Sequence, residues 1–315
     1  MDAALVIDKP QGMTSHDVVN RVRRILRERS VGHLGTLDPM ATGVLPLLVG
    51  RYTRLAQFFE KTEKTYEGEL RLGFSTDTYD ATGEPSSTRL SVQVPLEELR
   101  NAASKFLGRI EQTPPPFSAK KIAGVPAYKL ARKGQTPELK RVDVEVKDFQ
   151  ILDTVDDRIS FKAQVSAGTY VRSLVHDLGQ ALGAGAHLVA LRRTAAGQFS
   201  IGQAIGLEEL QAQAGGWSGT QRPITDIMLN TRERPPFLHP RELLPQFSAI
   251  SANEEMLQKI THGMALNLPD YSGCSHVKVF RGQAELVAIC ARVAGTLFQP
   301  RVVLMPSPVA ASVQN

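Results

Sequence analysis

The chain has 315 residues and a formal net charge of +5 at pH 7; 42% of its residues are hydrophobic and 22% are charged. This composition is ordinary for a globular protein that buries a core, and the modest positive charge permits a polyanionic partner without requiring one. The two cysteines, Cys274 and Cys290, belong to no cluster with zinc-ligand spacing, so we expect no structural zinc site and a reducing compartment.

The N-terminal residues lack the basic and apolar regions of a signal peptide. No apolar run is long enough to span a bilayer. We therefore expect a soluble, cytoplasmic protein without a membrane partner.

The first 30 residues predict a buried strand over residues 3–7 and then a helix capped by Thr14 or Ser15. The helix has one apolar face, and Arg23, Arg24 and Arg27 fall on the opposite face. Residues 21–29 contain five arginines and one glutamate. Two interpretations stay open for this basic face: an ordinary solvated surface, or contact with the phosphates of a nucleic acid.

The middle of the chain alternates between short strands and helices. Hydrophobic periodicity predicts strands over residues 44–49, 65–74, 142–151 and 159–165. It predicts helices over residues 53–59, 95–108, 169–182 and 187–193.

Residues 113–137 read as one long loop that is rich in basic residues. Lys120, Lys121 and Lys129 are interleaved there with Phe117 and Tyr128. Charge combined with aromatic stacking faces suits a nucleic-acid-binding loop, and a plain solvated loop is the competing interpretation.

Beyond about residue 245 the sequence becomes a small, strand-rich tail with strands predicted over residues 276–280, 285–292 and 296–304. Residues 211–222 resemble an insertion. The whole pattern predicts an α+β fold with a mixed, mostly antiparallel sheet, flanking helices and an appended β-rich module. We expect two domains, residues 1–245 and 246–315.

The most informative segment is the loop over residues 32–43, which places one carboxylate, Asp38, among small and flexible residues. Gly and Thr let a backbone approach a ligand closely. Asp38 could form a turn, act as a general base or act as a covalent nucleophile. A metal-ligand role is disfavoured because the loop holds no second acid. Composition alone does not choose among the remaining roles.

This loop and four other segments resemble the TruB family of tRNA pseudouridine synthases. Residues 32–50, GHLGTLDPMATGVLPLLVG, resemble the family's catalytic motif, and residues 6–15, VIDKPQGMTS, resemble its N-terminal motif. Residues 64–68, KTYEG, are similar to its tyrosine strand, residues 168–174, GTYVRSL, to its arginine helix, and residues 188–194 to its leucine motif. The resemblance covers nearly the whole chain.

The resemblance implies isomerisation of a T-loop uridine of tRNA, at position 55, to pseudouridine, with no cofactor and no metal. Asp38 would be the nucleophile, since an aspartate is already ionised at neutral pH. It would attack ribose C1′, attack uracil C6 or remove the C2′ proton. Arg172 would pair with Asp38 and keep it charged. Asp80 would hold Arg172 from behind, or would only form a turn.

The resemblance also assigns the walls of a base pocket. Tyr66 would stack on the flipped uracil and take the C5 proton, although its pattern alone indicates a core aromatic residue. Tyr170 and Leu191 would complete the pocket, and His33 would lie where the base leaves its stack; packing or loop-cap roles are the alternatives for all three.

The implied partner is the T-arm stem-loop of tRNA, whose target base must flip out of its stack. Arg23, Arg24, Arg27, Lys120, Lys121 and Lys129 would contact the RNA backbone. Residues 246–315 resemble a PUA-like RNA-binding module. We expect a monomer that acts without guide RNA. The alternatives are a guide-RNA-dependent enzyme and a non-catalytic tRNA-folding chaperone on the same scaffold.

Overall fold

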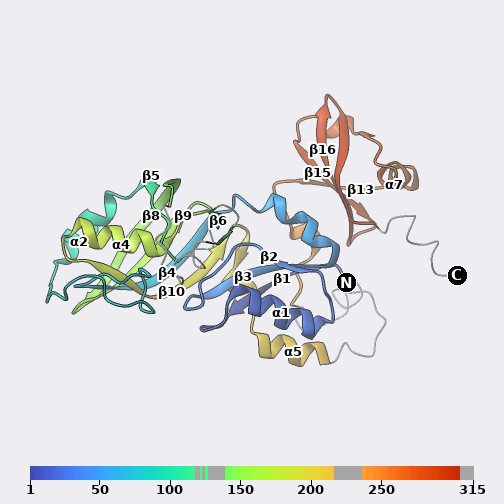
Figure 1. The fold of residues 1–315 in the computed structure, drawn as a ribbon. Helices are drawn as coiled ribbons and strands as arrows, with labels where there is room; N and C mark the ends of the chain where they lie inside the picture. Colours follow the sequence, from blue (N-terminus) through green and yellow to red (C-terminus); the bar gives the residue numbers. More distant parts are fainter. Residues whose placement is uncertain (118–120, 123–124, 127–138, 216–235, 306–315) are drawn as a thin grey trace.

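The computed structural model describes residues 1–117, 121–122, 125–126, 139–215 and 236–305. They form an elongated body built on one large mixed sheet, with a smaller β-rich module at one end (Figure 1). The predicted α+β class is confirmed. No helix among these residues has both the length and the apolar character needed to cross a membrane.

The large sheet has ten strands, and its main path follows the order β12-β1-β3-β10-β4-β9-β8-β5. The pairs β1–β12 and β3–β10 are parallel, and the other pairs are antiparallel, including β2 on β3 and β11 on β10. The strands are β1 Ala3–Lys9, β2 Val31–His33, β3 Thr42–Val49, β4 Lys64–Leu72, β5 Gly108–Gln112, β8 Val142–Val155, β9 Arg158–Val165, β10 Ala186–Ala196, β11 Phe199–Ser200 and β12 Ala204–Ile205.

Helices cover the two halves of this sheet separately. Helices α2 (Leu96–Ser104) and α4 (Val171–Ala181) lie over the half that contains β4, β8, β9 and β10, whereas α1 (Ser15–Leu26) and α5 (Leu207–Gly215) lie beside β1 to β3 (Figure 1). The shorter elements are η1 Gly50–Phe58, η2 Ile201–Gln203 and the two-stranded pair of β6 Lys121–Ile122 and β7 Val125–Pro126.

The C-terminal module is a five-stranded sheet in the order β13-β15-β16-β17-β14. Its elements are β13 Ser248–Ser251, α7 Glu254–Thr261, β14 Leu266–Asn267, η4 Pro269–Tyr271, β15 His276–Arg281, β16 Glu285–Ala294 and β17 Leu297–Val303, preceded by η3 Pro240–Glu242. The sequence patterns identified the three longest strands and missed β13, β14 and α7. The predicted division at residue 245 falls three residues before β13.

A shared apolar core joins the module to the body. Leu48 and Leu55 from the body pack in one cluster with Phe280 and Ile289 from the module. Leu243, from the segment that connects the two parts, is fully buried in the same cluster. The contact between module and body is therefore a continuation of the protein core.

The start of α1 is set by side-chain hydrogen bonds between residues that are close in the sequence. Thr14 caps α1: its hydroxyl accepts from the Asp17 N–H at 3.0 Å, and the Asp17 carboxylate accepts from the Thr14 N–H at 2.9 Å. This reciprocal pair satisfies two backbone donors at the helix start. Ser15, the other predicted cap, is instead the first helical residue.

The predicted helix over residues 187–193 is wrong, because this segment is part of strand β10 between β3 and β4. A register shift between Leu188 and Ala190 marks a bulge in the strand. Leu188 and Leu191 are three residues apart and both buried in the main core, which imitates helical spacing. The sequence patterns also missed β5, and α4 begins at Val171, two residues after the predicted cap.

We predict that Phe280→Ala lowers the free energy of unfolding by about 3 to 5 kcal/mol, because it empties a fully buried site in the shared core. Urea denaturation measures the loss. Val155→Ala, at a site 64% exposed, is the control and should change stability by no more than about 0.5 kcal/mol. A wild-type transition midpoint for Phe280→Ala would show that this packing is not required.

Candidate active site

Asp38 lies in the loop between β2 and β3, and α1 fixes that loop from one side. The Ser15 hydroxyl accepts from the Leu37 N–H at 2.8 Å and lies 3.1 Å from the Leu37 carbonyl oxygen, to which it donates. The Gly12 N–H donates to the Pro39 carbonyl oxygen at 2.8 Å. Both residues next to Asp38 are therefore held by the segment around the start of α1.

Lys9 holds the same loop from the end of β1. Its side chain is fully buried, and its ammonium group donates to the carbonyl oxygens of Pro10, Pro39 and Ala41 at 2.9, 3.3 and 2.7 Å. Burial lowers the pKa of Lys9 to about 8, and the Asp38 charge opposes that effect. A buried cation that donates to the carbonyls of Pro39 and Ala41 restrains the loop on the C-terminal side of Asp38.

Arg193 of β10 restrains the N-terminal side of the loop. Its guanidinium donates to the carbonyl oxygens of Val44 at 2.7 Å, Gly35 at 3.0 Å and Thr36 at 3.4 Å, and the residue is only 1% exposed. Gly43 lets β3 approach Arg193 closely, because a Cβ there would lie 2.2 Å from the Arg193 carbonyl oxygen.

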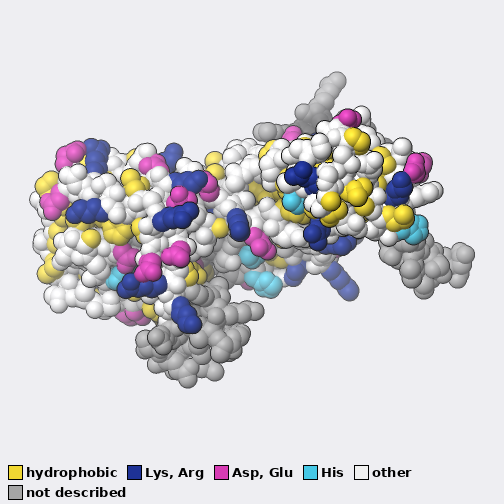
Figure 2. All heavy atoms as spheres, turned by 90° about the horizontal axis from the view of Figure 1, so that it is seen from above, with side chains coloured by type: hydrophobic (Ala, Val, Ile, Leu, Met, Phe, Trp, Pro, Cys, Tyr) yellow, Lys and Arg dark blue, Asp and Glu magenta, His cyan; other side chains and the backbone are white. Residues whose placement is uncertain are grey.

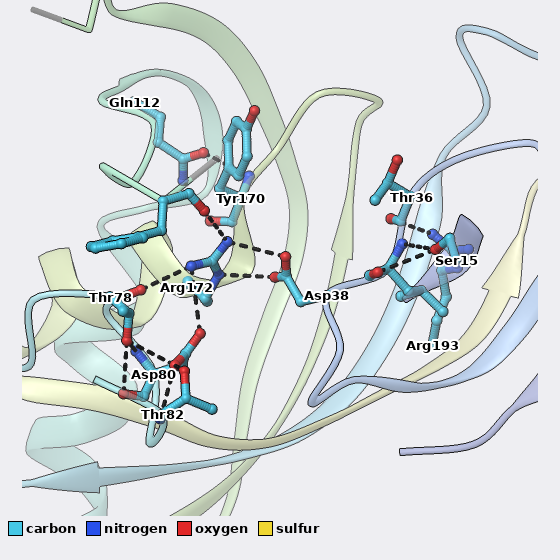
Figure 3. A network of polar contacts seen from close by, with 12 residues as sticks. Ser15, Thr36, Asp38, Thr78, Asp80, Thr82, Gln112, Tyr170, Arg172 and Arg193 are labelled. Carbon is cyan, nitrogen blue, oxygen red and sulfur yellow. Dashed lines mark hydrogen bonds and ion pairs between the residues drawn. The ribbon is translucent and has the colours of Figure 1, made fainter. Parts of the chain in front are cut away.

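Arg172, in the first turn of α4, pairs with Asp38 through two contacts (Figure 3). Its Nη2 donates to Asp38 Oδ1 at 3.1 Å, and its Nε lies 2.9 Å from Asp38 Oδ2. The Arg172 side chain is 5% exposed, whereas the Asp38 side chain is 35% exposed. The carboxylate is thus anchored by a buried cation and still accessible to a substrate.

Arg172 also contacts a turn that follows β4 and the segment that follows β5. Nη1 donates to the Thr78 carbonyl oxygen at 2.9 Å and lies 3.4 Å from Asp80 Oδ2, and Nη2 also donates to the Phe117 carbonyl oxygen at 3.0 Å. Asp80 Oδ1 accepts from the hydroxyls of Thr78 and Thr82 at 2.8 and 2.5 Å. Asp80 therefore both forms the turn and contacts Arg172.

Asp38 lies between two cavities. The smaller has a volume of about 240 Å³ and the larger about 770 Å³. Asp38 and Arg172 line both. The smaller cavity is also lined by Tyr66, Tyr170 and Leu191, three residues that the sequence analysis placed in a base pocket. The larger is lined by Thr14, Ser15, His16, His33, Thr36, Leu37, Pro39, Met40, Thr78, Asp80, Thr82 and Phe117.

The sheet explains how the residues of the smaller cavity meet. Strand β10 lies between β3 and β4, pairs Arg193 with Gly43 on one side and pairs Arg193 with Tyr66 on the other. Gln112 holds the backbone of Tyr170 through two hydrogen bonds. Its side-chain amide accepts from the Tyr170 N–H at 2.8 Å and donates to the Tyr170 carbonyl oxygen at 3.1 Å. Tyr170 is the residue that directly precedes α4.

His33 lines the larger cavity rather than the smaller. Burial, followed by the charges of Arg193 and His16, lowers the pKa of the His33 imidazole below its ordinary value. A neutral imidazole in the lining of this cavity is suited to contact with an uncharged group, such as a sugar or a base.

The predicted RNA-backbone residues do not behave alike. Arg24 and Arg27 are exposed, whereas Arg23 is partly buried and donates to the Asn20 side chain and to the Val31 carbonyl oxygen. Lys120 and Lys129 lie outside the described residues, and only the backbone of Lys121 is described. On the face seen in Figure 2, basic and acidic side chains are interspersed over the body.

Sequence reasoning gave no role in the site to Lys9, Ser15, Lys64, Gln112 or Arg193, all of which shape it. Because lysine is rarely buried without partners, a lysine at the end of a buried strand could have indicated a structural role for Lys9. Arg193 was hidden by the wrong helix assignment. In the part of the chain that the structure describes, no group of His, Cys, Asp or Glu side chains is arranged to hold a metal ion.

Comparison with known families and relatives gives a consistent result. A family model described as TruB family pseudouridylate synthase (N terminal domain) matches residues 23–171, and one described as tRNA pseudouridylate synthase B C-terminal domain matches residues 172–230. The chain is 44% identical over 307 residues to tRNA pseudouridine synthase B of Solibacter usitatus, which covers 96% of this chain and all of the relative. It is 41% identical to the Bacillus anthracis protein of the same name, over 84% of each chain.

Solved structures share the fold. A chain from a crystal structure of a Cbf5-Nop10-Gar1 complex superposes with a TM-score of 0.70 at 25% identity, covering 97% of this chain and 85% of that chain. A chain from an H/ACA RNP bound to a substrate RNA containing 2′-deoxyuridine superposes with a TM-score of 0.68 at the same identity, over 97% of this chain and 86% of that chain.

We predict that Gly43→Ala is more destabilising than Gly108→Ala, as measured by urea denaturation. Both residues have left-handed φ angles, +97° and +91°, so alanine strains the backbone at each by about 1 to 3 kcal/mol. Only at Gly43 does the new Cβ meet the backbone of Arg193, whereas nothing lies within 4 Å at Gly108. Overpacking should add about 1 to 3 kcal/mol at Gly43. Equal losses at the two sites would contradict the close approach of β3 and β10.

Proposed function

This chain belongs to the TruB family of pseudouridylate synthases, and we propose that it isomerises uridine 55 in the T-loop of tRNA to pseudouridine. The observation that carries the proposal is the Asp38–Arg172 pair, an accessible carboxylate held by a buried guanidinium between two cavities. The reaction moves the uracil from its N1 to its C5 attachment on the same ribose. It involves no redox change and no external group transfer, so the proposal includes no cofactor and no metal.

In this proposal the smaller cavity receives the flipped uracil. Tyr66 is 7% exposed and Leu191 is also 7% exposed, so both present apolar surface to the cavity and little to solvent. An aromatic ring offers a stacking face to a base, and we assign removal of the C5 proton to the Tyr66 hydroxyl. Tyr170 and Leu191 complete the wall, and His33 contacts the nucleotide from the lining of the larger cavity.

Arg172 fixes the direction of Asp38 and offsets its charge. Its guanidinium is planar and cannot lose its proton, and its contacts reach Asp38, Thr78, Asp80 and Phe117 at once. An ionised carboxylate in a fixed position can attack ribose C1′, attack uracil C6 or remove the C2′ proton. Arg172 therefore serves each of these routes in the same way.

The T-arm of tRNA is the proposed partner. Arg24 and Arg27, with the basic segment over residues 113–137, would contact its phosphates, and the PUA-like module over residues 246–315 would contact a further part of the RNA. The relatives named tRNA pseudouridine synthase B support a stand-alone enzyme rather than a guide-dependent one or a chaperone. We propose that the enzyme acts as a monomer. We place the activity in the cytoplasm, with the tRNA.

We predict that Asp38→Asn abolishes turnover and preserves tRNA binding. The amide keeps the size of the side chain but removes the nucleophilic charge, so the single-turnover rate should fall by about 10⁴-fold or more. Tritium release from C5-tritiated uridine in unmodified tRNA measures the rate, and filter binding measures affinity. The exposed Asp153→Asn is the control and should match the wild type. Turnover by Asp38→Asn at a rate near the wild type would remove Asp38 from the nucleophile role.

We predict that Arg172→Lys slows the reaction by about 10²-fold or more without weakening tRNA binding. A lysine keeps one positive charge but cannot reach Asp38, Thr78 and Phe117 together, so the carboxylate loses its fixed direction. The single-turnover assay measures the effect. Arg158→Lys, at an exposed surface ion pair with Glu69, supplies the control. Full activity in Arg172→Lys would mean that a positive charge next to Asp38 is sufficient for catalysis and that the geometry of the guanidinium group is not required.

A further inference from the structure

We propose that Lys64 is a further catalytic residue, whose ammonium group stabilises the negative charge that develops on the uracil ring during isomerisation. The inference rests on the proposed function and adds a role to a residue that lines the base pocket. It concerns the charge of the smaller cavity and does not depend on which atom Asp38 attacks first.

Lys64 is the first residue of β4, two positions before Tyr66 in the same strand. Side chains at alternate positions of a strand point to the same face, so Lys64 and Tyr66 approach the cavity together. Lys64, Tyr66 and Asp38 all line the smaller cavity. A Cβ placed on Gly35 would lie 3.6 Å from both Lys64 Cε and Arg193 Nη1, so the two cationic side chains flank the same part of the Asp38 loop.

The described lining of this cavity contains three cations and one carboxylate: Arg172, Arg193, Lys64 and Asp38. Arg172 neutralises Asp38 directly. The two remaining cations leave the cavity with an excess of positive charge. A neutral uracil does not require that excess, whereas an anionic uracil does.

The two excess cations differ in how far the protein already uses them. Arg193 donates to three carbonyl oxygens and therefore acts mainly on the loop. Within the described residues, the Lys64 ammonium donates one hydrogen bond, to the Thr62 carbonyl oxygen at 2.7 Å. An ammonium group has three N–H donors on a flexible stem. Lys64 is therefore the cation with donor capacity for a guest in the cavity.

The chemistry supplies an anionic guest on every route. When the N1–C1′ bond breaks, its electron pair stays on uracil and is shared among N1, O2 and O4. When Asp38 adds to C6 instead, the electron pair of the C5–C6 double bond moves towards C5 and O4. Forming the C5–C1′ bond consumes the pair. Any bond that Asp38 formed to ribose or uracil breaks with its electron pair returning to the carboxylate, and on the proton-transfer route Asp38 returns the proton to C2′. Loss of the C5 proton returns one pair to the ring, and N1 takes up one proton, so charge and atoms balance. Lys64 donates hydrogen bonds to O2 or O4 throughout and transfers no proton.

The charged state of Lys64 sets the pH range of this effect. Burial, followed by the nearby charge of Arg193, lowers the pKa of Lys64 to about 8. Arg193, Arg172, Asp38, Tyr66 and Tyr170 are the charged or titratable groups that line the cavity with it. Because the useful form is the protonated one, its contribution is present below about pH 8 and is lost as pH rises above that value.

The experiment compares Lys64→Met and Lys64→Arg with the wild type in single-turnover tritium release from C5-labelled tRNA. Lys64→Met removes the charge and keeps most of the side-chain volume. We expect its rate to fall by about 10² to 10³-fold, the usual effect of removing one donor that acts on a developing anion. The dissociation constant for tRNA should stay within about twofold. Lys64→Arg, which keeps a charge, should recover at least a tenth of the wild-type rate.

The ratio of the Lys64→Arg rate to the wild-type rate provides a second readout. Arginine stays protonated across the range, so this ratio should rise between pH 7 and pH 9 as Lys64 loses its proton. Other titrating groups, including Lys9, are present in both enzymes and cancel in the ratio. A purely structural role for Lys64 predicts a flat ratio.

Lys105→Met, at an exposed lysine that follows α2, is the matched control for loss of one positive charge, and circular dichroism checks that each variant is folded. A wild-type rate for Lys64→Met, a loss confined to tRNA affinity, a Lys64→Arg rate as low as that of Lys64→Met, or a flat pH ratio would each overturn the proposal. A wild-type protein without turnover on tRNA would instead refute the proposed function itself.

Discussion

A buried guanidinium needs a partner for each of its donors, and this requirement at Arg172 organises the centre of the molecule. Removing a charge from water is costly unless good geometry and further hydrogen bonds offset the loss. Arg172 obtains its partners from separate segments: Asp38 before β3, Thr78 and Asp80 after β4, and Phe117 after β5. The ion pair therefore links both halves of the large sheet at one point, and the reactive carboxylate lies at that point.

The sequence predicted those features that depend on which residue types stand near one another along the chain. The choice of Thr14 or Ser15 as the cap placed the start of α1 within one residue, and the alternation over residues 65–74 identified β4. The family resemblance assigned Asp38, Tyr66 and Arg172 to one site, and all three side chains line the smaller cavity.

Two kinds of feature escaped the sequence. Lys9 and Arg193 donate hydrogen bonds to backbone carbonyl oxygens of the Asp38 loop. Because every residue has a backbone carbonyl, the types of the partner residues do not indicate these contacts. The segment over residues 187–193 was assigned as a helix because a bulge in β10 changed the spacing of its buried leucines. That strand is what brings β3 and β4 close to each other, so one local error concealed how the pocket is assembled.

The packing between module and body has a geometric consequence for any long substrate. Leu243 and Leu244, in the segment that joins the two parts, are buried with Phe280 of the module and Leu48 of the body. A flexible linker would let the module sample many separations from Asp38, whereas a packed junction holds one. An RNA that contacts both the module and the pocket must therefore have two contact points whose spacing matches the distance between the module and the pocket.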